Sequence, residues 1–170
     1  MKIGLISDTH GQRARTAQAI RLLQAADVQA VLHAGDVGDA EILAQLGAAF
    51  GLQGLPVHAV AGNVDGWDDA ITRFPASEGV RMHVTSADLE LGGQRVFMTH
   101  GHHHQLLEQA IAAGRHDYVI HGHTHVRRDE QVGLTRVINP GAVQRSPEPG
   151  VAVLDLADGR LTFLDLPGGG

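Results

Sequence analysis

Short apolar runs recur along the chain, and their spacing is the feature that most constrains the fold. Runs of this length, bounded by Gly, Asp and Asn, predict β-strands. Between the first two runs, residues 13–26 place Ile20 and Leu23 on one face with a period near 3.6, which predicts a helix. A strand, a helix and a second strand in this order predict parallel pairing. The predicted strands cover residues 2–6, 28–33, 56–61, 95–99, 117–120, 135–138, 151–156 and 161–166.

The other segments complete the prediction of a single domain. They predict helices at 39–46 and 104–113, antiparallel strands around a Gly-Gly turn within 80–99, and a closing hairpin at 151–166. We therefore expect an α/β fold: a single-domain, four-layer αββα sandwich of two mixed β-sheets flanked by helices. This domain is expected to cover residues 1–166, with 167–170 as a flexible tail.

The composition excludes several classes of function. A chain of 170 residues, of which 43% are hydrophobic, fits one globular domain with a substantial core. The net charge of −6, from 13 Lys plus Arg against 19 Asp plus Glu, argues against binding to long nucleic acids. Cysteine is absent, so any metal site must use nitrogen and oxygen ligands. The apolar stretch after Met1 is too short for a signal peptide or a membrane span, which predicts a cytoplasmic protein without a membrane partner.

Polar side chains that can bind a metal follow five of the predicted strands. Because the carboxyl ends of parallel strands meet at one crevice, these side chains can converge although they lie far apart in the sequence. Glycines stand beside them, which suits tight turns and close approach of the backbone to an ion. In chain order, the groups are Asp8-Thr9-His10, Asp36, Asn63-Val64-Asp65, His100-Gly101-His102 and His121-Gly122-His123-Thr124-His125.

Each of these groups has an ordinary explanation when it is taken alone. Asp8 can cap the helix that follows it, and Asp36 can be a turn residue next to glycine. His33 and His58 lie inside apolar runs and are expected to be core histidines, and His83 is expected on a strand surface. The groups nevertheless occur together in order, and the final His-Thr-His projects two imidazoles to one side of an extended chain. This joint occurrence favours a metal cluster.

With these residues in order, the chain resembles the calcineurin-like metallophosphoesterases. Within them, it is similar to the small archaeal and bacterial phosphodiesterases of the group that includes the retromer scaffold subunit. The resemblance covers nearly the whole chain and extends to the late turn at Asn139-Pro140-Gly141. It implies two divalent metal ions, bridged by Asp36. It assigns one ion to Asp8, His10, Asp36 and His125, and the other to Asp36, Asn63, His100 and His123.

The implied metal pair suits phosphate chemistry. Two carboxylates opposite two dications leave a net positive charge, which attracts an anionic phosphate and acidifies a bridging water. We therefore expect hydrolysis of a phosphate ester by in-line attack of a metal-bridging hydroxide, with a phosphodiester favoured over a monoester. Imidazole, carboxylate and amide ligands suit Mn, Fe, Co, Ni or Zn more than Ca, and the resemblance favours manganese.

One position departs from the family's pattern. Many relatives have a histidine after the motif asparagine, assigned to protonation of the leaving group, but here that residue is Val64. Asp65 and His102 are therefore the candidates for a catalytic acid. Each has a structural alternative, because Asp65 can cap the next helix and His102 can support a metal ligand.

Two other functions fit parts of the sequence. A protein-interaction scaffold is the main alternative, since the retromer subunit has a degraded metal site, but here every implied ligand position holds a residue able to bind metal. His100, His102 and His104 alternate as in metallo-β-lactamase-type zinc hydrolases, but the Asp-His that follows in that motif is missing. The expected partners are a small phosphate-ester substrate and, through exposed strand edges, a second copy of the chain in a homodimer.

Overall fold

The computed structural model describes residues 1–167, so the predicted flexible tail lies outside the described residues apart from Pro167. Within this range, no helix is long and apolar enough to cross a lipid bilayer. The strands are β1 (Lys2–Ile6), β2 (Ala30–His33), β3 (Val57–Val60), β4 (Arg81–His83), β5 (Ser86–Leu91), β6 (Gln94–Thr99), β7 (Tyr118–Ile120), β8 (Arg128–Val132), β9 (Thr135–Asn139), β10 (Gly150–Asp155) and β11 (Arg160–Asp165). The α-helices are α1 (Arg13–Ala25), α2 (Ala40–Ala49), α3 (Asp69–Thr72) and α4 (His104–Ala112), and short 3₁₀ helices cover Gly51–Gln53 and Ala76–Glu78.

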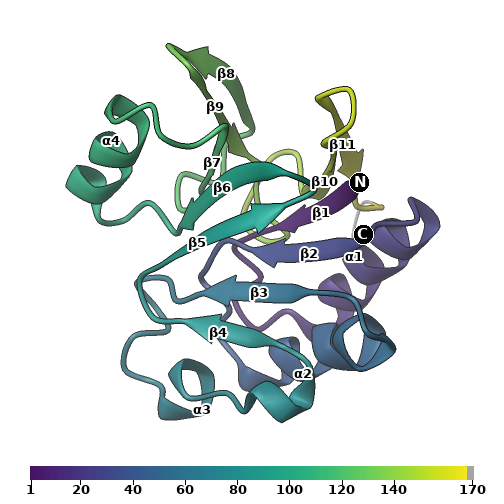
Figure 1. The fold of residues 1–170 in the computed structure, drawn as a ribbon. Helices are drawn as coiled ribbons and strands as arrows, with labels where there is room; N and C mark the ends of the chain where they lie inside the picture. Colours follow the sequence, from purple (N-terminus) through teal and green to yellow (C-terminus); the bar gives the residue numbers. More distant parts are fainter. Residues whose placement is uncertain (168–170) are drawn as a thin grey trace.

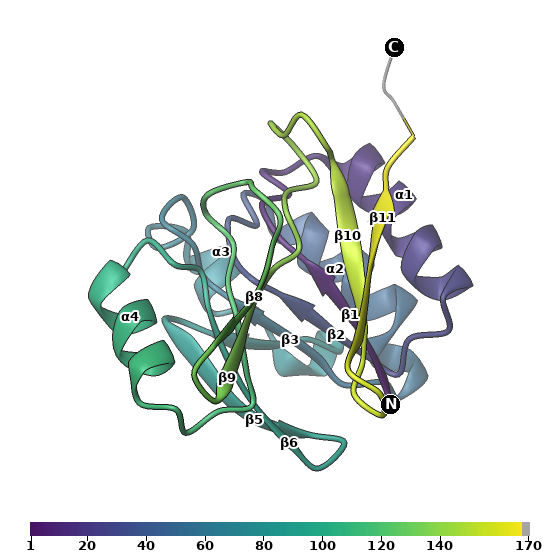
Figure 2. The same ribbon diagram turned by 90° about the horizontal axis from the view of Figure 1, so that it is seen from above.

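Two mixed sheets form the body of the molecule (Figure 1). The first sheet has the strand order β11-β10-β1-β2-β3-β4, and the second has the order β5-β6-β7-β9-β8. Strands β1 to β4 run parallel, as do β6, β7 and β9. Figure 2 shows β10 and β11 as a long hairpin beside β1, with which β10 pairs antiparallel. The parallel pairing places the carboxyl ends of β1, β2 and β3 along one edge of the first sheet.

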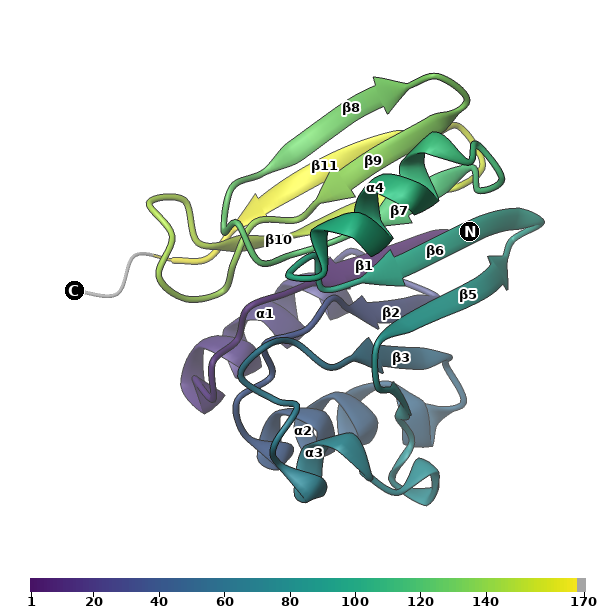
Figure 3. The same ribbon diagram turned by 90° about the vertical axis from the view of Figure 1, so that its left-hand side faces the viewer.

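Three apolar clusters separate four layers. The first cluster fills the space between the sheets, where Leu5 and Leu32 pack with Met98 and Ile120. The second joins the outer face of the first sheet to α1 and α2, and the third holds α4 against the second sheet. Burial of each such large side chain contributes roughly 1.5–3 kcal/mol. Figure 3 shows α1, α2 and α3 together on one side and α4 apart from them, so the predicted αββα sandwich is confirmed.

Besides the short helices at Gly51–Gln53, Asp69–Thr72 and Ala76–Glu78, whose ranges the sequence does not predict, three elements differ from the sequence prediction. Arg81–His83 does not join the antiparallel strands after it, because it pairs parallel to β3 at the edge of the first sheet. Strand β8 is not predicted, since its central residues are exposed and polar and it is held by pairing with β9 rather than by an apolar face. Helix α2 continues past residue 46 to Ala49, and within it a Cβ at Gly47 would lie 2.0 Å from the carbonyl oxygen of Glu78.

Candidate metal centre

Strand ends from both sheets deliver side chains to one edge of the sandwich, where they form two overlapping clusters. In the first cluster, candidate ligand atoms of Asp8, His10 and His125 lie within 4.8 Å of one another. His125 Nε2 is 3.2 Å from Asp8 Oδ1, and the Nε2 atoms of His10 and His125 are 3.3 Å apart. His10 Nε2 also lies 3.8 Å from Asp36 Oδ2. The topology thus joins residues that are 115 positions apart in the sequence.

The second cluster shares Asp8 with the first and adds Asp36 and His100, again within 4.8 Å. His100 Nε2 lies 3.3 Å from Asp36 Oδ1 and 3.2 Å from Asn63 Oδ1. The ring of His123 meets the ring of His100 edge-on, with 5.2 Å between centroids, and its backbone N–H donates to Asp8 Oδ2 at 3.2 Å. All seven residues that the resemblance assigns as ligands therefore lie at this edge. Asp36 belongs to the second cluster and also lies near His10 of the first.

The hydrogen bonds of His100 and His125 leave their Nε2 lone pairs facing carboxylate oxygens, which would repel each other unless a proton or a cation lies between them. His100 Nδ1 donates to the carbonyl oxygen of Ala34 at 2.8 Å, and His125 Nδ1 donates to that of Arg145 at 3.1 Å. Because a carbonyl oxygen can only accept, Nε2 of each neutral ring presents a lone pair. These lone pairs face carboxylate oxygens at 3.3 and 3.2 Å. Carbonyls that orient a histidine in this way are usual behind metal-bound imidazoles.

Burial and charge act differently on the two carboxylates. Burial raises the pKa of Asp8, and its Oδ1 atom accepts no hydrogen bond within the described residues. Burial also acts to raise the pKa of Asp36, but the hydrogen bond and charge of His100, with the backbone N–H of Val64, lower it to about 2. Burial acts to lower the pKa of His100, but its interactions with Asp36 and Asp8 raise it. The buried, unpartnered oxygen of Asp8 beside imidazole nitrogens fits a divalent cation.

The backbone of the site is strained in a way typical of functional sites. Five of the seven predicted ligands have φ angles between 45° and 69°, which are uncommon for residues other than glycine. Glycines allow the close approaches, since a Cβ at Gly62 would lie 2.1 Å from Asp36 Oδ1. A Cβ at Gly122 would lie 2.0 Å from Ser7 Oγ. The five residues with positive φ are Asp8, His10, Asp36, His123 and His125.

Asp65 binds backbone amides and is fully buried. Its Oδ2 accepts hydrogen bonds from the backbone N–H groups of Val37 and Gly62 at 2.9 and 2.8 Å, and its Oδ1 accepts one from Gly38 at 2.8 Å. This carboxylate therefore ties the loop that carries Asp36 to the loop that follows β3. Because both oxygens accept hydrogen bonds from the backbone, the geometry argues against the predicted role of Asp65 as a leaving-group acid.

Two buried side chains support Asp8 and the loop after β2. Ser7 Oγ donates to Asp8 Oδ2 at 2.6 Å. His33 is buried, as expected, but it also orders the site, because its Nδ1 accepts the backbone N–H of Gly35 at 3.2 Å. Its Nε2–H therefore donates to Thr9 Oγ1 at 3.0 Å, and burial lowers the pKa of His33 to about 4, which keeps the ring neutral. The sequence marks His33 only as a core residue, since its partners come from distant loops.

Arg145 and Asn139 hold the loops on the other side of the site. Arg145 has a φ of 59°, and its carbonyl oxygen accepts the Nδ1–H of His125 at 3.1 Å. Burial lowers the pKa of His10, and the charge of Arg145 acts in the same direction. Asn139, in the predicted late turn, donates from Nδ2 to the carbonyl oxygen of Gly122 at 2.9 Å. No pattern in the sequence reveals the left-handed backbone of Arg145, so its role at the site could not be predicted.

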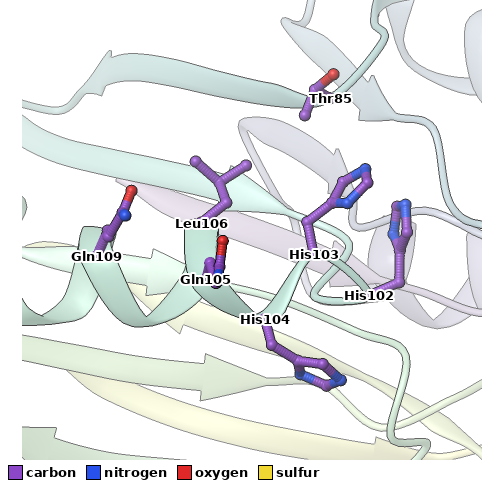
Figure 4. A pocket seen from close by; sticks show the side chains of 7 residues that line it. All are labelled: Thr85, His102, His103, His104, Gln105, Leu106 and Gln109. Atoms are coloured by element: carbon purple, nitrogen blue, oxygen red, sulfur yellow. The ribbon is translucent and has the colours of Figure 1, made fainter.

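A cavity of about 650 Å³ lies beside the second cluster and is lined in part by His102 and His104 (Figure 4). The His102 ring lies 5.4 Å from that of His100, and the His104 ring lies 6.1 Å from that of His123. Within residues 1–167, neither His102 nor His104 belongs to a metal-type cluster, so the zinc-hydrolase alternative lacks its ligand set. Burial, together with the charges of neighbouring histidines, lowers the pKa of His102 to about 4.

Comparisons with known proteins agree with the fold and identify the family. Residues 1–159 match the family model described as the calcineurin-like phosphoesterase superfamily domain. A phosphodiesterase of Methanocaldococcus jannaschii is 34% identical over 142 residues, which cover 83% of each chain. The solved structure of an archaeal phosphodiesterase has a TM-score of 0.87 and 30% identity, covering 98% of this chain and 100% of that one. The vacuolar protein sorting 29 structure from Cryptosporidium parvum, with a TM-score of 0.69, 21% identity and coverage of 96% and 95%, shows the shared fold alone.

Proposed function

Because the chain belongs to the calcineurin-like phosphoesterase superfamily, we propose that it is a metal-dependent phosphodiesterase that hydrolyses a small phosphate ester. The observation that carries this proposal is the pair of overlapping clusters, in which carboxylate oxygens face imidazole nitrogens at 3.2 and 3.3 Å. Superfamily membership implies divalent metal ions. The archaeal relatives named above are phosphodiesterases, which supports a diester substrate over a monoester.

The seven clustered residues suit two ions. Asp36 directs Oδ2 toward His10 and Oδ1 toward His100, which supports the proposal that it bridges the ions. When bound, the ions would polarise the phosphate and acidify a water for in-line attack. Manganese is the ion that we propose, from the family resemblance, and the nitrogen and oxygen donors, which include no thiolate, are compatible with it. The proposed sets are Asp8, His10, Asp36 and His125 for one ion, and Asp36, Asn63, His100 and His123 for the other.

The chain's own residues orient the site and supply a candidate for assistance to the leaving group. Hydrogen bonds from Nδ1 to backbone carbonyls aim the Nε2 atoms of His100 and His125 at the carboxylates. Asp65 holds the loops after β2 and β3 together through hydrogen bonds to their backbone N–H groups. His102 remains the candidate for this assistance, and its Nδ1 is buried without a hydrogen-bond partner within the described residues. A pKa of about 4 leaves its ring neutral at pH 7, so it would assist the leaving group by donating a hydrogen bond and not by giving up a proton, which favours esters with good leaving groups.

The alternative of a protein-interaction scaffold has less support. All seven ligand positions hold residues able to bind metal, and a sorting protein similar to this chain shares its fold alone. We propose further that the edges of the sheets support a homodimer. A cytoplasmic location, without membrane or long nucleic-acid partners, stays a prediction from the composition.

The test is hydrolysis of bis(p-nitrophenyl) phosphate and p-nitrophenyl phosphate by metal-stripped protein, restored in turn with Mn²⁺, Zn²⁺, Ni²⁺ or Mg²⁺. We expect turnover only after metal is restored, fastest with Mn²⁺ and with the diester. Asp36→Asn should abolish turnover, whereas Asp158→Asn, which changes an exposed turn carboxylate, should leave it intact. Turnover that survives both chelation and Asp36→Asn would rule out the mechanism. Protein that binds metal but hydrolyses neither ester would support the scaffold.

A further inference from the structure

The cavity beside the second cluster has a lining that the hydrolytic chemistry does not require. We name it the glutamine pocket, and it is lined by Thr85, residues 102–106 and Gln109. We infer that this pocket binds one organic arm of the phosphodiester, and that this arm is a flat, uncharged heterocycle of the nucleobase type. The inference rests on the proposed function and names the class of substrate that the site takes.

The glutamine pocket is contiguous with the metal centre. Two of its wall residues are in contact range of the second cluster, since the His102 ring lies 5.4 Å from His100 and the His104 ring 6.1 Å from His123. An ester group on a phosphate held at that cluster therefore borders the pocket directly. The cavity volume, about 650 Å³, lies within the range of roughly 300–1,000 Å³ that is usual for small-molecule sites.

The lining selects against charged groups. None of the residues that line the pocket is Asp, Glu, Lys or Arg, so an ammonium group would find no carboxylate there, and a second phosphate would meet imidazoles but no fixed positive charge. The imidazoles of His102 and His103 lie with their ring centroids 3.9 Å apart, but within residues 1–167 they belong to no metal-type cluster. An uncharged organic group therefore fits this wall better than an additional ion.

The two glutamines offer hydrogen bonds that match the edge of a heterocycle. Gln105 and Gln109 are four residues apart on α4, so their side chains lie on the same face of the helix. Each amide offers donors and an acceptor, and a glutamine amide is complementary to the adjacent donor and acceptor of adenine. Figure 4 shows Leu106 and Gln109 projecting from the helix on the side toward Thr85. Leu106 and the imidazole faces supply apolar and aromatic surface against which a flat ring can stack.

The experiment compares two diesters that share a leaving group and differ only in the other arm. They are adenosine 5′-(p-nitrophenyl phosphate) and methyl p-nitrophenyl phosphate, assayed with the full Mn²⁺-loaded chain. We expect kcat/KM to be about tenfold higher for the adenosine ester, mainly through KM. Gln105→Ala with Gln109→Ala should remove most of this preference. Both positions are exposed on a helix, where alanine is well tolerated, and Gln53→Ala, at another exposed glutamine, is the matched control that should keep the preference.

A binding measurement separates this inference from the proposed function. Calorimetry of the Mn²⁺-loaded protein should give tighter binding of adenosine 5′-monophosphate than of inorganic phosphate, and the double glutamine variant should lose the difference. If neither ester is hydrolysed with any metal, the proposed function fails, and the calorimetric comparison still decides the inference. Equal kcat/KM and equal binding for the two arms in the native chain would overturn the inference. A preference that survives unchanged in the double variant would also overturn it.

Discussion

Two pairs of histidines in this chain have nearly the same geometry but different surroundings. In the candidate metal centre, the rings of His10 and His125 have centroids 5.3 Å apart and Nε2 atoms 3.3 Å apart. At the edge of the first sheet, the rings of His58 and His83 also have centroids 5.3 Å apart, with Nδ1 of one 3.0 Å from Nε2 of the other. Two aspartates lie within 4.0 Å of the first pair. The second pair has no such carboxylate within the described residues, and the charge that acts on it is that of Arg81.

Close imidazoles do not by themselves make a metal centre. The first pair sits where the carboxyl ends of β1 and β2 deliver Asp8 and Asp36, so its nitrogens face negative oxygens. The second pair lies on neighbouring strands β3 and β4, and one imidazole donates a hydrogen bond to the other. Burial lowers the pKa of His58 to about 4, and the charges of His83 and Arg81 act in the same direction. The second pair is therefore a neutral, hydrogen-bonded pair.

The largest expected effect comes from removing each pair in turn. His10→Ala with His125→Ala should raise the Kd for Mn²⁺ on the order of 1000-fold, because direct ligands contribute more than outer partners, which are worth 10- to 100-fold. His58→Ala with His83→Ala should change it less than about twofold, since that pair has no carboxylate partner. Competition with a fluorescent chelator measures the Kd for Mn²⁺ of both double variants. A similar loss of affinity in the two double variants would contradict the distinction.

The next largest effect concerns the carboxylate that orders the loops around the first pair. Asp65→Ala removes three hydrogen bonds to a charged acceptor and should lower the free energy of unfolding of the metal-free protein by about 3 kcal/mol. Asp65→Asn keeps one acceptor oxygen, so its free energy of unfolding should lie between those of the native protein and Asp65→Ala. The control is Asp68→Ala, which removes an exposed helix cap and should cost only about 1 kcal/mol. Urea unfolding gives these values, and equal losses at the two positions would contradict the role of Asp65.

A smaller effect is expected from the protonation of the second pair. The folded pKa of His58, about 4, lies below its usual value of 6.5, so between these values the unfolded chain binds more protons than the folded chain. The free energy of unfolding of the metal-free protein should therefore fall as pH drops from about 6.5 to 4. His58→Gln should reduce this fall by roughly 1–2 kcal/mol after allowance for solvent screening. Urea midpoints at pH 7.5 and pH 5 measure the difference, and an unchanged pH dependence in the variant would refute the assignment.

The smallest expected effect distinguishes the arginines near the two pairs. Arg145 acts on His10 in the metal centre, and Arg81 acts on His58 and His83. Arg145→Gln should raise KM for an anionic diester about three- to fivefold, because a positive charge near the reacting phosphate is lost. Arg81→Gln should leave KM within about twofold of the native value. Steady-state kinetics at low ionic strength, where charges are least screened, gives both values, and equal KM changes would remove the special role of Arg145.

The architecture and the proposed ligand positions could be read from the sequence, whereas the roles of Arg145 and His33 could not. Short apolar runs separated by helical patterns predict a mixed α/β sandwich, because strand and helix periodicity are local properties. The metal-type residues could be found because each follows a strand, and the carboxyl ends of parallel strands meet at one edge. Their assignment to two ions came from the resemblance. The sequence did not separate Asp65, which orders backbone, from Asp36, which faces imidazoles, because both follow strands beside glycine.

Which side chains face one another follows from the folded arrangement and not from the sequence pattern. It paired His58 with His83, joined Arg145 to His125, and placed Arg81–His83 in the first sheet rather than in the antiparallel stretch after it. It also placed Gln105 and Gln109 in one pocket with His102 and His104. The physical reason is that these contacts depend on strand register and loop conformation, including left-handed φ angles at non-glycine residues, and a sequence pattern records neither.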